Sequence, residues 1–172
     1  ATQTPAKPAA QTPVKPATQT PANKSDSIPT TKGGGVDAAK TARNKNAAGD
    51  ITYHKDGSVT ISPRVEARIQ QMADNLNCDS TALKGLLFAE SGWQVNPKSS
   101  AAGLNQLTTD GLNGYNRTYG TKYTKQDIRN MDTMQQLDIV ENSLQLSKSI
   151  AGFGQNHQLS NGQLFAMNLY PA

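Results

Sequence analysis

The chain has 172 residues, of which 35% are hydrophobic and 17% are charged, and its net charge is +4. Residues 1–49 hold seven Lys and Arg against two Asp and Glu, or +5, whereas residues 50–172 hold ten against eleven, or −1. Because the positive balance lies wholly in the first part, we expect no nucleic-acid-binding domain. We also expect no membrane span, because no apolar run approaches ~20 residues. The single cysteine, Cys78, excludes an internal disulfide and a multi-cysteine zinc site.

Residues 1–49 are rich in Pro, Ala, Thr and Lys and contain six of the nine prolines and no aromatic residue. Gln-Thr-Pro recurs at residues 3–5, 11–13 and 19–21. Proline favours extended polyproline-type backbone, so we predict a linker or spacer without a core, followed by a flexible joint at Gly33–Gly35. An alternative is a spacer that runs along a partner assembly. The first residue is Ala1 and no signal-peptide apolar region follows it, which suggests a processed chain or a fragment.

Residues 50–62 are predicted to form a β-hairpin, because Asp56-Gly57 lies between β-rich flanks and is a strong signal for a two-residue turn. An isolated hairpin is marginally stable in water, so we expect it to pack against something else.

Helical patterns fill much of residues 63–172, so the predicted fold class is mostly α (α+β). The first helix starts after Pro63, the second is capped by Asp79 or Ser80 and runs to Glu90, and the third starts near Asp132. The last starts at a capping box formed by Ser160 and Gln163. The apolar stripes are Val65, Ile69, Met72, Ala73 and Leu76; Leu83, Leu86 and Leu87; and Leu137, Val140, Leu144 and Ile150. Between the second and third helices lies a polar stretch rich in Gly, Asn and Tyr.

Glu90 is the most informative residue for chemistry. It lies at the end of the apolar run Leu86–Ala89, and Gly92 follows it. Apolar neighbours and the negative end of a helix dipole both favour the protonated form of a carboxyl group, which can then donate a proton to a leaving oxygen. Cleavage of a glycosidic bond requires this step. The alternative is an ordinary solvated Glu at a helix end.

Leu86–Gly92 and Ala102–Leu107 resemble the glutamate and Gly-Leu-x-Gln motifs of the lysozyme-like soluble lytic transglycosylases, which cut the sugar backbone of bacterial peptidoglycan. Gln136–Glu141 and Leu164–Ala172 are similar to segments of lysozyme-like domains on bacteriophage tails. The resemblance covers residues 63–172 and implies a lysozyme-like fold. It also implies peptidoglycan glycan strands as substrate and a place in the virion (phage tail), with action in the host periplasm or cell wall. Residues 1–62 would then contact other tail or baseplate proteins.

By this resemblance, Glu90 is the catalytic acid, Ser91 orders the turn behind it, and Gln106 holds the sugar through its amide. Tyr170 occupies the place of a family aromatic residue, and its hydroxyl is expected near Glu90; the alternative is a half-buried packing residue. Trp93 either stacks on a sugar face or covers the core.

Two positions depart from the family pattern. Asn105, included among the candidate substrate-binding residues, replaces an apolar residue, and Tyr170-Pro171 replaces the Tyr-Asn of cellular members. Hydrolytic lysozymes usually use a second carboxylate. Goose-type lysozymes place an Asp where this chain has Thr108; Asp110 lies nearby, but a helix cap or solvated turn also explains it.

With one clear carboxylate, we expect intramolecular attack. Glu90 protonates the bridging oxygen, then accepts the proton of the muramyl 6-hydroxyl as an anhydro ring closes. This mechanism requires no cofactor and no metal.

Other functions remain open at this point. A hydrolytic lysozyme would use Asp110, and a Cys/His peptidase would use Cys78 and His157. A lysozyme-like module that only binds glycan or plugs an assembly would use no catalytic residue. A secreted bacterial wall-remodelling enzyme would use residues 1–49 as a tether.

Overall fold

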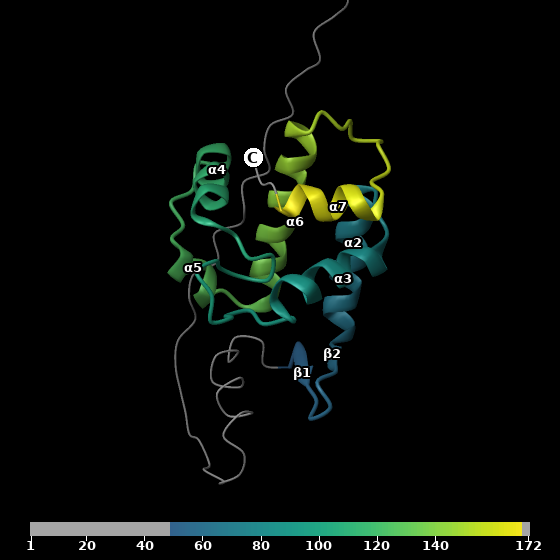
Figure 1. The fold of residues 1–172 in the computed structure, drawn as a ribbon, viewed down its shortest axis with the longest axis vertical. Helices are drawn as coiled ribbons and strands as arrows, with labels where there is room; N and C mark the ends of the chain where they lie inside the picture. Colours follow the sequence, from purple (N-terminus) through teal and green to yellow (C-terminus); the bar gives the residue numbers. More distant parts are fainter. Residues whose placement is uncertain (1–48, 170–172) are drawn as a thin grey trace, which may run out of the picture. The chain divides into compact units, whose positions relative to one another are not determined.

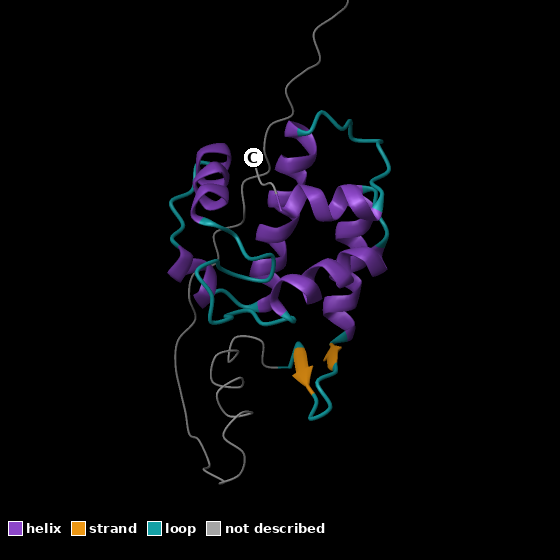
Figure 2. Cartoon of the chain, in the orientation of Figure 1, coloured by secondary structure: helices purple, strands orange, loops and turns teal. Residues whose placement is uncertain are grey.

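The computed structural model describes residues 49–169, a mostly helical region with one short antiparallel hairpin (Figures 1 and 2). The predicted Pro-rich spacer, residues 1–48, lies outside the described residues. Within them, no helix is both long and apolar enough to cross a membrane. The elements are β1 (Ile51–Tyr53), β2 (Val59–Ile61), α2 (Pro63–Leu76), α3 (Ser80–Ser91), α4 (Thr109–Tyr119), α5 (Lys125–Asn130), α6 (Thr133–Ile150) and α7 (Asn161–Leu169).

The predicted hairpin is present, with Ile51 opposite Ile61 and Tyr53 opposite Val59. The predicted two-residue turn is wrong: the amide of His54 donates to the carbonyl of Ser58, so the turn spans Lys55 to Gly57. Gly57 has φ +87°, the left-handed conformation that closes a three-residue hairpin loop. The hairpin packs on the helices as expected.

Two contacts anchor this hairpin. Ile51 is buried in the main core, and the hydroxyl of Tyr53 donates to the carbonyl of Trp93 over 2.7 Å. Burial raises the pKa of Tyr53 to about 12, so its hydroxyl remains a donor at neutral pH. The strand β1 therefore holds the loop that follows α3.

A buried carboxylate joins the hairpin to α2. Asp50 is 3% exposed and accepts hydrogen bonds from both the Arg64 guanidinium and the Ser62 hydroxyl. The hydrogen-bonded guanidinium of Arg64 holds the pKa of Asp50 below its usual value, although burial acts in the opposite direction. The Ser62 hydroxyl also caps α2 by accepting from the amide of Val65.

This lowered pKa predicts a pH-dependent contribution to stability. Since the folded-state pKa lies below the unfolded value of about 3.9, the stabilisation is present at neutral pH and is lost as the pH falls through the folded-state pKa. Asp50→Asn should lower the free energy of unfolding by about 1–3 kcal/mol at pH 7, as expected for a buried hydrogen-bonded group. Urea unfolding at pH 7, 5 and 3 should show the difference from wild type shrinking below about pH 4. Asp110→Asn, on the exposed first turn of α4, is the control and should show little change.

Helices α2 and α3 confirm the first two helical predictions. All five predicted apolar residues of α2 are buried. Asp79 caps the start of α3, and Gly92, at φ +58°, ends it by donating its amide to the carbonyl of Phe88. The C-terminal end of α3, where Glu90 lies, is thus fixed by the local sequence.

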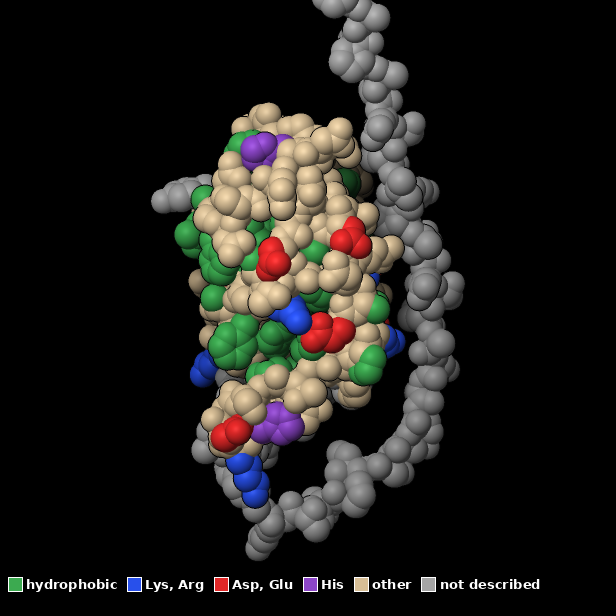
Figure 3. Space-filling view, turned by 90° about the vertical axis from the view of Figure 1, so that its right-hand side faces the viewer, with side chains coloured by type: hydrophobic (Ala, Val, Ile, Leu, Met, Phe, Trp, Pro, Cys, Tyr) green, Lys and Arg blue, Asp and Glu red, His purple; other side chains and the backbone are tan. Residues whose placement is uncertain are grey.

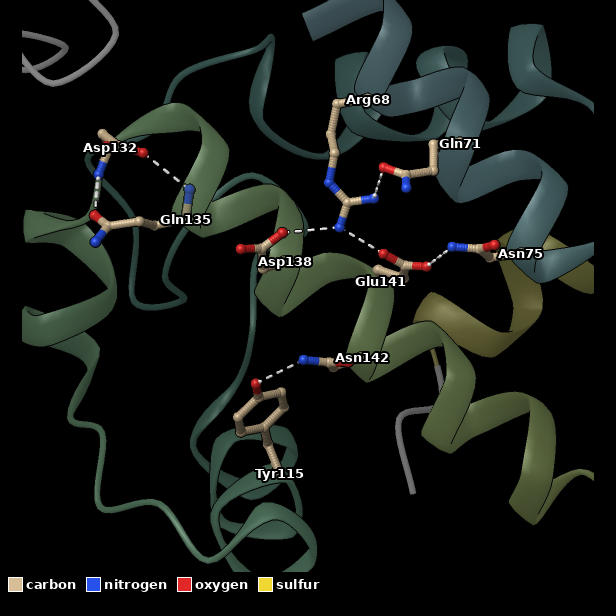
Figure 4. Close-up of polar contacts among 9 residues, drawn as sticks. All are labelled: Arg68, Gln71, Asn75, Tyr115, Asp132, Gln135, Asp138, Glu141 and Asn142. Carbon is tan, nitrogen blue, oxygen red and sulfur yellow. Dashed lines mark hydrogen bonds and ion pairs between the residues drawn. The ribbon is translucent and has the colours of Figure 1, made fainter. Parts of the chain in front are cut away.

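Helix α6 is the central element, since it packs against α2, α4 and α7 (Figure 1). A polar network fixes it on α2: Arg68 donates to Asp138 and Glu141, and Asn75 donates to Glu141 (Figure 4). Leu137, Val140 and Leu144 are buried as predicted. The prediction for Ile150 is wrong, because it lies in the last turn and is 60% exposed.

The last helix, α7, starts at the predicted capping box. The amide of Gln163 donates to the Ser160 hydroxyl, and the amide of Ser160 donates to the Gln163 side chain. The preceding loop is held by Lys148, a buried residue whose Nζ donates to the carbonyls of Leu76 and Gln155. These contacts fix the start of α7 and the loop before it.

The polar stretch between the second and third predicted helices contains two further helices, α4 and α5, which the sequence pattern did not predict. They form a second small core with α6, separate from the main one. Tyr115 is buried there, with the Tyr119 ring 4.6 Å and the Tyr123 ring 6.4 Å away between centroids. Tyrosines and glycines in place of an aliphatic stripe explain why the helical periodicity was hidden.

Candidate functional site

Glu90 lies in the last turn of α3, two residues before the helix ends at Gly92. It is partly buried, and across residues 49–169 its carboxylate forms neither a hydrogen bond nor an ion pair. Phe88, two residues earlier and therefore on a different face of the helix, is 52% exposed. The structure thus presents a partly buried carboxyl group at a helix end, without a partner in the described part of the chain.

The second motif forms a closed turn. The amides of Ala102 and Leu107 each donate to the other's carbonyl, over 3.0 and 2.8 Å, so the four residues between them form a closed turn. Gly103 has φ +77°, and a Cβ there would lie 2.9 Å from a methyl carbon of Ile128. Glycine is required at this position by both the backbone conformation and the packing.

Gln106 completes this turn in a conformation that is unfavourable for a non-glycine residue. Its φ is +51°, one of three positive values among the non-glycine residues described, the others being Asn77 and Trp93. Its side-chain amide donates to the carbonyl of Gly103 over 2.8 Å, and within residues 49–169 its side-chain oxygen is free to accept a hydrogen bond. Backbone strain of this kind is commonly retained where a side chain must point in a set direction.

A buried glutamine, Gln136 of α6, is hydrogen-bonded to this turn. Its side-chain oxygen accepts from the amide of Leu104 over 3.0 Å, and its amide nitrogen donates to the carbonyls of Val95 and Ile128 over 2.7 and 2.9 Å. It therefore joins the loop after α3, the turn and the end of α5. In the sequence, Gln136 is only one residue of the segment Gln136–Glu141, and nothing in its spacing indicates this role.

Helix α7 also contacts this turn. The side-chain amide of Asn168 donates to the carbonyl of Asn105 over 3.4 Å. Asn105, Gln106 and Asn168 line a cavity of about 10 Å³, which is room for about one water molecule. Since α7 also packs against α3, one helix links the turn to the helix that carries Glu90.

The other predicted site residues occupy different environments. Ser91 is buried, and its hydroxyl donates to the carbonyl of Leu87 over 3.0 Å, so it braces the last turn of α3. Trp93 is 4% exposed within the main core, so the structure gives it the core-covering position and not an open face for a sugar. Asn105 is 4% exposed and is likewise a packing residue of the turn. Tyr170 lies outside the described residues.

Thr108 and Asp110, the two positions considered for a second carboxylate, lie at the start of α4. Thr108 caps α4, its hydroxyl accepting from the amide of Gly111 over 3.2 Å. Asp110 is exposed in the first turn of α4, where a negative charge is favoured by the helix dipole. The position of Asp110 matches the alternative given for it above, a helix start or solvated turn.

The peptidase alternative lacks support from the geometry. Burial raises the pKa of Cys78 to about 11, with a further rise from the charge of Asp79, whereas a catalytic cysteine needs a lowered thiol pKa. The His157 ring stacks on Phe153, and its Nε2 lies 3.3 Å from the Gln163 side chain.

The raised pKa predicts a slow reaction of Cys78 with thiol reagents. At a pKa of about 11 in place of 9.0, the thiolate fraction at pH 7 falls about a hundredfold. The rate of alkylation by iodoacetamide should therefore be far below that of the same chain in urea, and should rise with pH beyond pH 9. A rate at pH 7 equal to that of the unfolded chain would contradict this environment.

In residues 49–169, no group of three or more His, Cys, Asp or Glu is arranged to hold a metal ion. No protein-family model, curated protein or solved structure matches the chain.

Proposed function

We propose that this protein is a peptidoglycan lytic transglycosylase with a lysozyme-like fold, in which Glu90 is the only acid and base. The observation that carries the proposal is the partly buried Glu90 carboxyl group, which has no partner among residues 49–169. The fixed turn that presents Gln106 supports it, because a side chain held at positive φ gives an oriented hydrogen-bonding group for a sugar.

In the proposed reaction, the Glu90 carboxyl donates its proton to the oxygen that bridges N-acetylmuramic acid and N-acetylglucosamine. The bond from the muramyl C1 to that oxygen breaks through an oxocarbenium-like transition state. The muramyl 6-oxygen then bonds to C1, and its proton passes to the Glu90 carboxylate, which restores the acid. Bonds and protons balance without water as a reactant.

An intramolecular nucleophile is favoured over water because the neighbouring candidate groups are engaged in helix starts. Thr108 has no carboxylate and caps α4, and Asp110 lies exposed in the first turn of that helix. Thr108 therefore supplies no base, and no contact within residues 49–169 directs the Asp110 carboxylate toward Glu90.

The products distinguish the transglycosylase reaction from hydrolysis. Digestion of purified peptidoglycan should release fragments with 1,6-anhydromuramyl ends, which are about 18 Da lighter than the hydrolysed fragments because no water is added. Mass spectrometry of the fragments measures this directly. Mainly reducing ends would make the protein a hydrolytic lysozyme and would direct attention to Asp110.

One observation favours a second candidate, a glycan-binding or plugging module without activity. The cavity beside Gln106 has a volume of about 10 Å³, and Trp93 is buried, so neither provides a sugar pocket or an open stacking face. A sugar that contacts Gln106 would therefore bind over the surface of the turn. A wild-type protein that binds purified peptidoglycan but releases no fragments would support this module.

The place of action proposed here is the phage virion, where residues 1–62 would contact tail or baseplate proteins; the alternative is a secreted bacterial wall enzyme. Cross-linking of intact particles followed by mass spectrometry would identify the neighbours of the N-terminal segment. Cross-links to tail proteins would support the virion.

A further inference from the structure

The charges of the described residues are segregated. Residues 98–130, here called the cationic lobe, include α4 and α5 and hold five Lys and Arg against two Asp and Glu, a net charge of +3. The rest of residues 49–169 holds five against nine, a net charge of −4. Figure 3 shows the side turned away from α4 and α5, where Asp and Glu side chains (red) are scattered over a mostly uncharged surface. A field divided in this way favours an anionic partner on the lobe.

Two cations of the lobe are fixed by backbone carbonyls. Nζ of Lys125 donates to the carbonyl of Ser100 over 2.6 Å, and the Arg129 guanidinium donates to the carbonyls of Ser99 and Ala101, both over 3.0 Å. None of the ion pairs within residues 49–169 includes a cation of the lobe. Their charge is therefore not neutralised by a neighbouring carboxylate of the described chain.

The fixed cations lie next to the candidate site along the chain. Residues 99–101, whose carbonyls they bind, lead directly into the Ala102–Leu107 turn that presents Gln106. Lys98 precedes the same residues, and Lys122 lies three residues before Lys125; both are exposed. Lys125 and Arg129 are thus held against the segment that leads into the Gln106 turn, and two exposed lysines flank these contacts along the chain.

We propose that the cationic lobe binds the carboxylates of the peptide stems on the peptidoglycan strand that Glu90 cleaves. This inference rests on the proposed function. In a stem-bearing strand the lactyl carboxyl of each muramyl residue is bound in an amide, so the sugar backbone offers these cations no counter-charge, whereas the peptide stems place free carboxylates at regular intervals. The lobe therefore favours strands whose stems carry free carboxylates over strands whose stems are amidated.

The experiment measures binding of the full chain carrying Glu90→Gln, so that cleavage does not interfere. The test variant adds Lys98→Gln and Lys122→Gln, two exposed residues that form no hydrogen bond or ion pair with the rest of residues 49–169. The control adds Lys55→Gln and Lys84→Gln, which removes the same charge outside the lobe. Lys84 pairs with Glu66, a contact that contributes ~1 kcal/mol or less, so urea unfolding checks that this variant is folded. The test and control variants both keep the +5 charge of residues 1–49, so any contribution of this segment to binding is the same in the two.

Co-sedimentation with purified peptidoglycan stripped of teichoic acid should show affinity reduced about 2- to 30-fold in the test variant, the range for two exposed ion pairs, and little change in the control. On the same material with its stem carboxylates amidated by carbodiimide coupling, the test variant and its parent should bind equally. Raising the ionic strength from 0.1 M to 1 M should reduce the difference on untreated material, because screening shortens the reach of the charges.

Three outcomes would overturn the proposal: equal loss in the test and control variants, an undiminished difference on amidated material, or binding that requires teichoic acid phosphate. Failure of the wild type to cleave peptidoglycan would instead overturn the proposed reaction, and it would leave this binding result unaffected.

Discussion

Glu90→Gln should fold normally and lose about 10²- to 10⁴-fold in the rate of peptidoglycan cleavage. Glutamine keeps the shape of the side chain but has no carboxyl proton to give to the bridging oxygen. Because Glu90 forms no hydrogen bond or ion pair within residues 49–169, the change removes no stabilising contact of this region. Release of dye from labelled peptidoglycan measures the rate, and urea unfolding checks the fold.

Glu66→Gln is the matched control for this change. Glu66 is an exposed residue of α2 that pairs with Lys84 at 3.1 Å, and an exposed pair of this kind contributes ~1 kcal/mol or less. We expect it to retain the wild-type rate. Cys78→Ser should do the same, because no step of the reaction uses a thiol. An active Glu90→Gln together with an inactive Cys78→Ser would transfer the chemistry to the cysteine.

Gln136→Leu should lower the free energy of unfolding by about 3 kcal/mol or more. The change leaves the amide of Leu104 and the carbonyl of Val95 buried without their present partner, and each unsatisfied group costs about 1–3 kcal/mol. The carbonyl of Ile128 loses one of two donors and keeps the amide of Met131. Since a domain is typically stable by only about 5–15 kcal/mol, this loss is a large part of the total. Urea unfolding provides the measurement.

Gln70→Leu controls for the loss of a glutamine amide on a helix. Gln70 is exposed on α2 and donates to Asp74 one turn later, so its replacement should change stability by less than about 0.5 kcal/mol. A loss below about 1 kcal/mol in Gln136→Leu would mean that the turn and the end of α5 are held by other contacts.

The elements with aliphatic periodicity and strong end signals were predictable from sequence. Helices α2, α3, α6 and α7 begin at Ser62, Asp79, Asp132 and Ser160, each a capping residue whose hydrogen bond is local. Helices α4 and α5 were not predicted, although Thr108 caps one and Thr124 with Asp127 forms a capping box on the other. Those end signals were present, but the apolar stripe between them was too weak to mark a helix.

The candidate site was predictable only in its local parts. The position of Glu90 at the end of a helix follows from Gly92, and the tight turn follows from Gly103, because both effects act within a few residues. The support of that turn by Gln136 depends on a contact 32 residues apart, and sequence spacing alone does not reveal which polar side chain is buried beneath a loop. The hydrogen bond from the Tyr53 hydroxyl to the carbonyl of Trp93 likewise joins residues 40 apart, and the sequence around Trp93 does not reveal it.

The proposed function requires that the end of α3, which carries Glu90, and the Ala102–Leu107 turn, which carries Gln106, form one glycan-binding surface. The most direct measurement is a titration of ¹⁵N-labelled Glu90→Gln protein with a tetrasaccharide of alternating N-acetylglucosamine and N-acetylmuramic acid, followed by NMR of the backbone amides. We expect shift changes concentrated in residues 88–91 and 103–107, and weaker binding when Gln106→Gly is added, since glycine keeps the positive φ and removes the amide side chain. Shift changes absent from both segments, or confined to α6 and the N-terminal half of α7, would contradict the account.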